Sequence, residues 1–129
     1  MNNEEKSRFW VEVVCGIGKY SNPQLLKEHL DRSTFSEFCD CGCNSFKVEI
    51  DKSAGLSPIS KLGKYGPIFE CDFYLGGESV EPRRTLEIII FTDEDGYISY
   101  FEVDCCANSY PVPDKVDLEG EPFHVYQHS

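Results

Sequence analysis

The chain has 129 residues, of which 40% are hydrophobic and 27% are charged, and its formal net charge is −11. This length and composition predict one folded domain, residues 1–129, and exclude a disordered chain or a protein of two domains. The strong negative charge argues against nucleic acid as a partner, because the phosphate backbone would repel the protein.

Two helices are predicted in the N-terminal part of the chain. Residues 4–18 carry apolar side chains at helical spacing, namely Phe9, Trp10, Val13, Val14 and Ile17. A strand over residues 9–14 is the alternative, since valine also favours strands, but we favour the helix. The second helix is expected to begin at Ser21, the predicted N-cap, which has Gln24 three residues later in a capping-box pattern. This helix should end near Arg32 and bury Leu25, Leu26, His29 and Leu30.

Two strands are predicted in the middle of the chain. Apolar and polar residues alternate in residues 46–51 and again in residues 69–75, which is typical of half-buried strands. Residues 53–67 lie between them and are rich in glycine, serine, proline and lysine, so we expect a loop there.

A hairpin is the strongest pattern in the sequence. Residues 84–92 contain a nearly continuous apolar run, the segment Asp93–Gly96 supplies turn residues, and residues 97–104 alternate again. The pattern predicts two further strands. On the second of them, one face is expected to carry Ile98, Tyr100, Glu102 and Asp104.

The C-terminal tail is predicted to be extended and irregular, because Pro111 and Pro113 cannot donate hydrogen bonds to a sheet. A short edge strand that anchors it is expected around Phe123, Val125 and Tyr126. The order of elements predicts an α+β fold, with two N-terminal helices packed on an antiparallel sheet of about four strands.

Three of the seven cysteines lie close together, at Cys39, Cys41 and Cys43. Thiolates are zinc ligands, so these residues are a candidate metal site, with Cys71 or the Cys105–Cys106 pair as a source of a fourth ligand. A redox-linked function of the same three cysteines is a further alternative. Zinc sites usually place two residues between paired cysteines, whereas only one separates them here. The more ordinary interpretation is that these are small apolar side chains entering the sheet.

The compartment is expected to be the cytoplasm. The sequence contains no apolar run of the ~20 residues that a membrane-spanning helix needs. Its first residues also lack the basic and apolar pattern of a signal peptide. We therefore expect no contact with a membrane, and reduced thiols in place of disulfides.

Catalysis is not predicted. The three histidines, His29, His124 and His128, stand in a helical stripe or in the tail, with no pattern that pairs them to a nucleophilic cysteine. Neighbouring carboxylates are plentiful, but an acid–base pair requires one of them to be buried, and the sequence does not show burial. We expect a protein that is not an enzyme, with no catalytic residue and no cofactor.

Two segments resemble elements of small bacterial proteins. Cys39–Phe46, read CDCGCNSF, resembles a CGC-x-S element that precedes a strand. Asp95–Val103, read DGYISYFEV, resembles a DGYLS-x-LEV hairpin, and Pro113-Asp114 matches a later LPD. In these motifs and their order the chain is similar to immunity proteins encoded beside polymorphic toxins, including contact-dependent growth inhibition systems. The resemblance implies binding and neutralisation of a cognate toxin domain, with a basic nuclease as the expected class.

A candidate partner-binding site follows from the uneven charge. From Asp93 to the C-terminus, nine acidic residues stand against a single base, Lys115. Solubility is the ordinary explanation; attraction of a basic partner, whose active site the acidic residues would occlude, is the sharper one. The predicted interface joins the hairpin tip to one face of the following strand: Asp93, Glu94, Asp95, Tyr100, Glu102 and Asp104.

Overall fold

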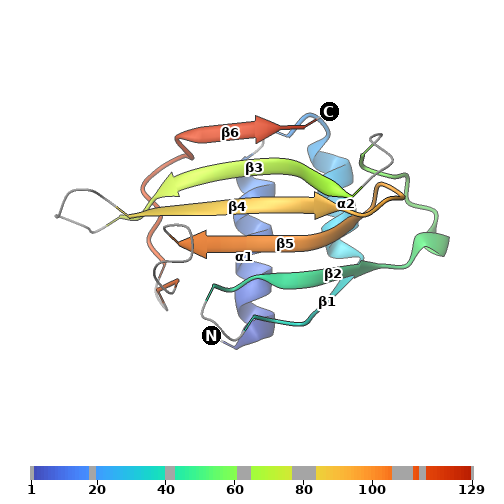
Figure 1. Ribbon diagram of the computed structural model, residues 1–129, viewed down its shortest axis with the longest axis horizontal. Coiled ribbons are helices and arrows are strands. Elements are labelled where there is room, and N and C mark those ends of the chain that lie inside the picture. Colours follow the sequence, from blue (N-terminus) through green and yellow to red (C-terminus); the bar gives the residue numbers. More distant parts are fainter. Residues whose placement is uncertain are drawn as a thin grey trace.

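The computed structural model describes residues 2–17, 20–39, 43–60, 65–76, 84–105, 112–113 and 116–128. Its helices are α1 (Asn3–Ile17), α2 (Pro23–Asp31) and the short 3₁₀ helix η1 (Lys52–Ala54). The strands are β1 (Ser33–Ser36), β2 (Phe46–Ile50), β3 (Gly66–Tyr74), β4 (Thr85–Thr92), β5 (Ile98–Cys105) and β6 (His124–Gln127). Neighbouring strands are antiparallel, in the order β1-β2-β5-β4-β3-β6 (Figure 1). The predicted α+β class is confirmed, but the described sheet has six strands where about four were expected.

Helix α1 buries one stripe of its surface against the sheet, which confirms the helix and rules out the alternative strand at residues 9–14. The residues of this stripe that are buried are Ser7, Trp10, Val11 and Val14. Phe9 stacks edge-on against Trp10, with 4.9 Å between ring centroids. The apolar spacing read from the sequence therefore corresponds to the face that the helix turns toward the core.

Helix α2 begins one residue later than predicted. Its N-cap is Asn22, whose side-chain oxygen accepts a hydrogen bond from the backbone N–H of Leu25 at 3.2 Å. Ser21 as the cap is wrong, because its backbone N–H and its hydroxyl both bond to the side chain of Gln127 in β6. The helix ends at Asp31, as expected.

A bulge changes which residues of β5 face the core. Phe91 pairs with Tyr100, but the next residue of β4, Thr92, pairs with Ile98. Ser99 is therefore an extra residue in the ladder, which is the definition of a β-bulge. Ile98 is 1% exposed and belongs to the core, so the prediction that it shares a face with Tyr100 is wrong.

The two edge strands are short. Strand β1 was not predicted; it pairs with β2 from Ser33 opposite Ile50 to Ser36 opposite Lys47. Strand β6 confirms the edge strand expected in the tail, and pairs with β3. Both edge strands contain polar residues, and their strand conformation depends on pairing with the neighbouring strand more than on local sequence preference.

The core lies between the helices and one face of the sheet. Both helices lie behind the sheet as it is drawn in Figure 1, and α1 runs across the strands. The largest fully buried side chains include Trp10, Phe46, Phe69, Phe101, Leu86, Ile88 and Ile90. No described helix covers the opposite face (Figure 1). Among the described helices, none has the length and apolarity to cross a membrane.

Candidate protein-binding face of the sheet

The face of the sheet opposite the helices, named here the open face, carries two rows of acidic residues. Residues directly opposite each other on paired strands point to the same face. One row runs through Asp72 of β3, Glu87 of β4 and Asp104 of β5, which are directly opposite one another. The next row runs through Glu70, Ile89 and Glu102. Five carboxyl groups are thus gathered on three neighbouring strands.

The described part of the chain neutralises the acidic rows poorly. Among the described residues, no lysine or arginine forms an ion pair with Glu87, Glu102 or Asp104. Like charges directly opposite each other destabilise a sheet. This arrangement therefore costs folding free energy, which a cationic partner would recover by supplying the missing charge.

The pKa values of Glu87 and Glu102 on this face are both raised, in part by the charges of neighbouring carboxylates. Burial, together with the negative charges of Asp72 and Asp104, raises the pKa of the Glu87 carboxyl to about 7. A hydrogen bond between Glu87 and Asp72 acts in the same direction, because the protonated carboxyl can donate to its neighbour. Burial, and then the charge of Asp104, also raise the pKa of Glu102. Near neutral pH, Glu87 is therefore only partly ionised.

Two histidines border the rows on the β6 side. His124 Nδ1 lies 2.9 Å from Asp72 Oδ2, and His128 Nε2 lies 2.5 Å from Glu70 Oε2. These contacts involve the two acidic residues of β3, whereas no described histidine forms an ion pair with those of β4 and β5.

Aromatic side chains flank the acidic rows in both directions along the strands. Beyond the row of Glu102, Phe91 lies 6.3 Å from Tyr100 and stacks on the exposed Tyr65, with centroids 5.8 Å apart. Beyond the row of Asp72, Tyr74 stacks on Phe123 at 4.2 Å, and both rings are exposed. Aromatic rings beside charged groups are a composition found at the centres of protein interfaces.

The structure divides the predicted partner-binding residues into two groups. Tyr100, Glu102 and Asp104 lie on the open face, as the alternation in β5 required. The hairpin tip is a separate place, at the end of β4 and β5, and two of its acidic residues are already paired. Lys52 Nζ lies 2.8 Å from Asp93 Oδ2 and 2.7 Å from Asp95 Oδ2.

Asp93 also holds the turn of the hairpin. Its side chain accepts hydrogen bonds from the backbone N–H groups of Asp95 at 2.9 Å and Tyr97 at 3.1 Å. Gly96 has a positive φ of 88°, and a Cβ placed on it would lie 2.3 Å from the carbonyl oxygen of Ser60. Asp93 and Asp95 therefore serve the structure of the hairpin itself. Glu94 is exposed and takes no part in these contacts.

Sequence reasoning missed three acidic residues of the open face: Glu70, Asp72 and Glu87. The alternation in residues 69–75 did place Glu70 and Asp72 opposite the apolar positions. Nothing local, however, specified that β3 lies beside β4 in a register that brings Asp72 opposite Glu87. The histidine contacts were missed for the same reason, since they depend on β6 pairing with β3.

The cysteine segment is only partly within the described residues, because Cys41 lies outside them. Cys39 is half-buried and Cys43 is buried. Ser45, two residues on, connects this segment to β5, since its hydroxyl accepts from the backbone N–H of Val103 at 2.9 Å. Within the described ranges, no group of three or more histidine, cysteine or acidic side chains is arranged to hold a metal ion.

The proposed fourth ligands have structural positions of their own. Cys71 and Cys105 are fully buried in the core, and Cys106 lies outside the described residues. Burial raises the pKa of the Cys71 thiol to about 12, so this side chain stays protonated and behaves as a small apolar group.

Comparison of the chain with protein-family models, with curated proteins and with solved structures finds no match. The resemblance to immunity proteins therefore stays a prediction. The open face is the feature of the structure that bears most directly on function.

Proposed function

We propose that this protein acts by binding a basic protein surface on the open face of its sheet, and that it is an immunity protein for a cognate toxin domain. The observation that carries the proposal is the pair of acidic rows without a lysine or arginine partner among the described residues. The toxin class is supported by the sequence motifs alone, and a basic nuclease is the expected activity.

Charge supports binding of a cationic partner. Each carboxylate of the open face lowers the electrostatic energy of an approaching lysine or arginine, and the net charge of −11 adds long-range attraction. Arginine suits this face well, because its planar guanidinium can bond two carboxylate oxygens at once. A nuclease presents such groups where it binds phosphate, so the acidic rows would imitate the substrate and occlude the site.

Shape supports an interface anchored by aromatic rings. Phe91 and Tyr100 flank the rows along the strands, with Ile89 between Glu70 and Glu102. Apolar side chains at these places supply buried area, while the carboxylates select the partner and accelerate encounter. In this proposal the hairpin tip has the lesser role, because Lys52 already compensates Asp93 and Asp95.

A charge-matched pair of variants tests this surface. At pH 8, above the pKa of about 7 of Glu87, the triple variant Glu87→Gln, Glu102→Gln, Asp104→Asn removes close to three negative charges from the open face. The control, Glu4→Gln, Glu5→Gln, Glu12→Gln, removes three from exposed positions on α1. The binding partner would be the C-terminal domain of the protein encoded by the adjacent open reading frame, and association rates would be measured at several salt concentrations.

The open-face variant is expected to associate at least about tenfold more slowly and with a weaker dependence on salt. The α1 control should retain most of the wild-type rate. If both variants lose the same amount, net charge alone is responsible and the open face is not the interface. Absence of any complex with that domain would refute the immunity function.

A further inference from the structure

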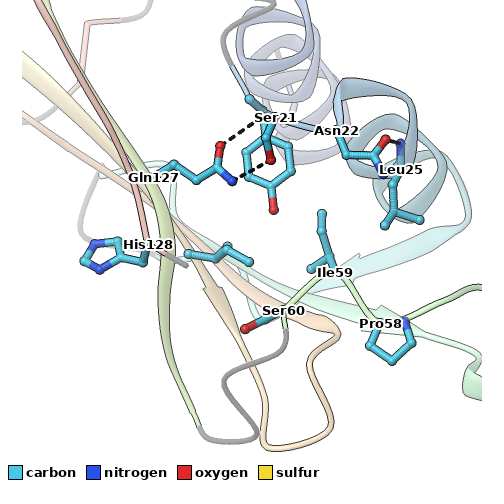
Figure 2. A pocket seen from close by; sticks show the side chains of 10 residues that line it. Ser21, Asn22, Leu25, Pro58, Ile59, Ser60, Gln127 and His128 are labelled. Atoms are coloured by element: carbon cyan, nitrogen blue, oxygen red, sulfur yellow. Dashed lines mark hydrogen bonds between the residues drawn. The ribbon is translucent and has the colours of Figure 1, made fainter.

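A cavity of about 330 Å³ lies between the helix layer and the β3–β6 edge of the sheet (Figure 2). Its wall is formed by the residues at the start of α2, the segment 58–60, and residues of β3 and β6. Tyr20 packs edge-on against Phe69 there, with ring centroids 5.5 Å apart. Both rings belong to the covered side of the sheet, so the cavity is distinct from the acidic rows of the open face.

Tyr20 is a buried polar residue in the wall of this cavity. It is only 6% exposed, and no described residue forms a hydrogen bond with its hydroxyl. Burial raises its pKa to about 12, so the group stays protonated and remains a donor at physiological pH. The Tyr20 ring is buried, but its hydroxyl is not among the fully enclosed side-chain atoms and reaches the volume of the cavity. A molecule in the cavity that carries an acceptor could therefore take a hydrogen bond from it.

Three polar side chains of the wall, Ser21, Asn22 and Gln127, accept hydrogen bonds within the protein and still have N–H or O–H donors. Figure 2 shows Gln127 of β6 joined to Ser21 by two hydrogen bonds. In these bonds Gln127 Oε1 accepts from Ser21 N at 2.9 Å, and Ser21 Oγ accepts from Gln127 Nε2 at 2.6 Å. The oxygen of Asn22 accepts from Leu25 N, which leaves its amide nitrogen without a described partner. A donor-rich wall suits a ligand that offers oxygens.

The start of α2 adds a favourable field for negative charge. The N-terminus of a helix carries a partial positive charge from its aligned peptide dipoles. No described aspartate or glutamate lines the cavity. The ring of His128 points away from it in Figure 2 and contacts Glu70 instead. The cavity thus combines a weakly positive helix end with a described wall that has no carboxylate.

Apolar side chains complete the wall. Leu25, Ile59 and Ile68 line the cavity, and Ile59 projects into it in Figure 2. We propose that this cavity binds a small monocarboxylate with an apolar body. Its carboxylate would face Tyr20 and Asn22, and its body would lie against the three aliphatic side chains.

Benzoate is a suitable probe, because it combines one carboxylate with a compact apolar ring. Titration of the full chain would be followed by NMR of the leucine and isoleucine methyl groups. We expect saturable shifts at Leu25, Ile59 and Ile68 in the millimolar range that is usual for so small a ligand. Shifts that do not saturate, or that are spread over the whole surface, would overturn the proposal.

Tyr20→Phe tests the role of the hydroxyl. Because this hydroxyl has no described partner, its removal should leave the thermal unfolding midpoint unchanged or raise it. Benzoate binding should weaken about three- to tenfold, the effect of one lost hydrogen bond. Tyr126→Phe is the matched control, since Tyr126 is 51% exposed on the other side of the sheet. Equal affinity in wild type and Tyr20→Phe would overturn the proposed contact.

Benzamide tests whether the cavity recognises the carboxylate or only the planar shape of the ligand. It has the same ring and nearly the same shape, but it is uncharged and offers one acceptor oxygen. Benzoate is expected to bind more tightly, because both of its oxygens can accept from the donors of the wall. Tighter binding of benzamide would show that the cavity prefers a neutral group, and would refute a carboxylate ligand.

Discussion

Ile88 and Ile89 are neighbours on β4, yet they belong to faces of the sheet that are built on opposite principles. Ile88 is fully buried under the helices and is surrounded by apolar side chains. Ile89 lies on the open face, between Glu70 and Glu102 in the ladder. The covered face favours folding at every position, whereas the open face places carboxylates opposite one another. Local rules of stability are often broken at functional sites, and this contrast is the physical basis for assigning binding to the open face.

The largest effect is expected from the covered face. Ile88→Ala should lower the free energy of unfolding by about 2–5 kcal/mol, because it leaves a cavity in a packed core. Ile89→Ala removes the same atoms from a half-buried position, and should cost no more than about 1 kcal/mol. Urea denaturation of the two variants gives both values. Equal losses would contradict the distinction between the faces.

The effects of these two substitutions on partner binding should be the reverse of their effects on stability. Ile89→Ala is expected to weaken binding on the open face, while Ile88→Ala should leave the affinity of the folded fraction unchanged. Binding would be measured below the denaturation midpoint of both variants. A loss of affinity confined to Ile88→Ala would place the interface elsewhere.

Repulsion on the open face predicts that removing a charge stabilises the protein. Glu87 has a folded-state pKa of about 7, above its ordinary value of 4.5. The unfolded chain therefore loses this proton first, and stability falls as the pH rises from about 4.5 to 7. Glu87→Gln should raise the free energy of unfolding by about 1–2 kcal/mol at pH 8.

The gain from Glu87→Gln should disappear below about pH 4, where the carboxyl is protonated in both the folded and the unfolded state. Glu94→Gln is the control, because Glu94 is exposed at the hairpin tip and should change stability little at any pH. Denaturant titrations across this pH range provide the test. A destabilising Glu87→Gln would mean that the acidic rows are compensated in a way the described contacts do not include.

Much of the fold could be predicted because its strongest patterns are local. The apolar spacing in α1 and the hairpin of β4 and β5 are encoded within short stretches, and both were found. Strand β1, read Ser-Thr-Phe-Ser, was missed because so short and polar a segment becomes a strand only by pairing with β2. The N-cap was misplaced by one residue, since Ser21 and Asn22 are both good caps and only the contact with Gln127 decides between them.

The candidate site was harder to predict because it depends on register. Tyr100, Glu102 and Asp104 were found, since alternation within one strand is enough to place them on one face. Asp72 and Glu87 belong to other strands, and only the pairing of β3, β4 and β5 brings them beside Asp104. The bulge at Ser99 likewise moved Ile98 to the core, which strict alternation does not allow.

The smallest effect on the free energy of unfolding is expected at the hairpin tip. There, replacing an acid by its amide should destabilise the protein, whereas Glu87→Gln should stabilise it. Burial alone would raise the pKa of Asp93. The hydrogen bonds from Lys52 and from the backbone N–H groups of Tyr97 and Asp95 outweigh it, and lower the pKa below the ordinary 3.8. Such a carboxylate stabilises the fold above the unfolded pKa, and its contribution is lost as the pH falls through the folded value.

Asp93→Asn is therefore expected to cost about 0.5–1 kcal/mol at pH 7, since it removes a partly exposed ion pair and weakens the turn. The cost should diminish as the pH falls through the folded-state pKa of Asp93, where the wild-type carboxyl also becomes protonated. Lys52→Met should also destabilise the protein, and the double variant should lose less than the two single losses together, because they remove a shared contact. A stabilising effect of Asp93→Asn, like that expected of Glu87→Gln, would contradict this account. It would mean that carboxylates at the tip also repel one another without compensation, and the tip would then belong to the proposed interface.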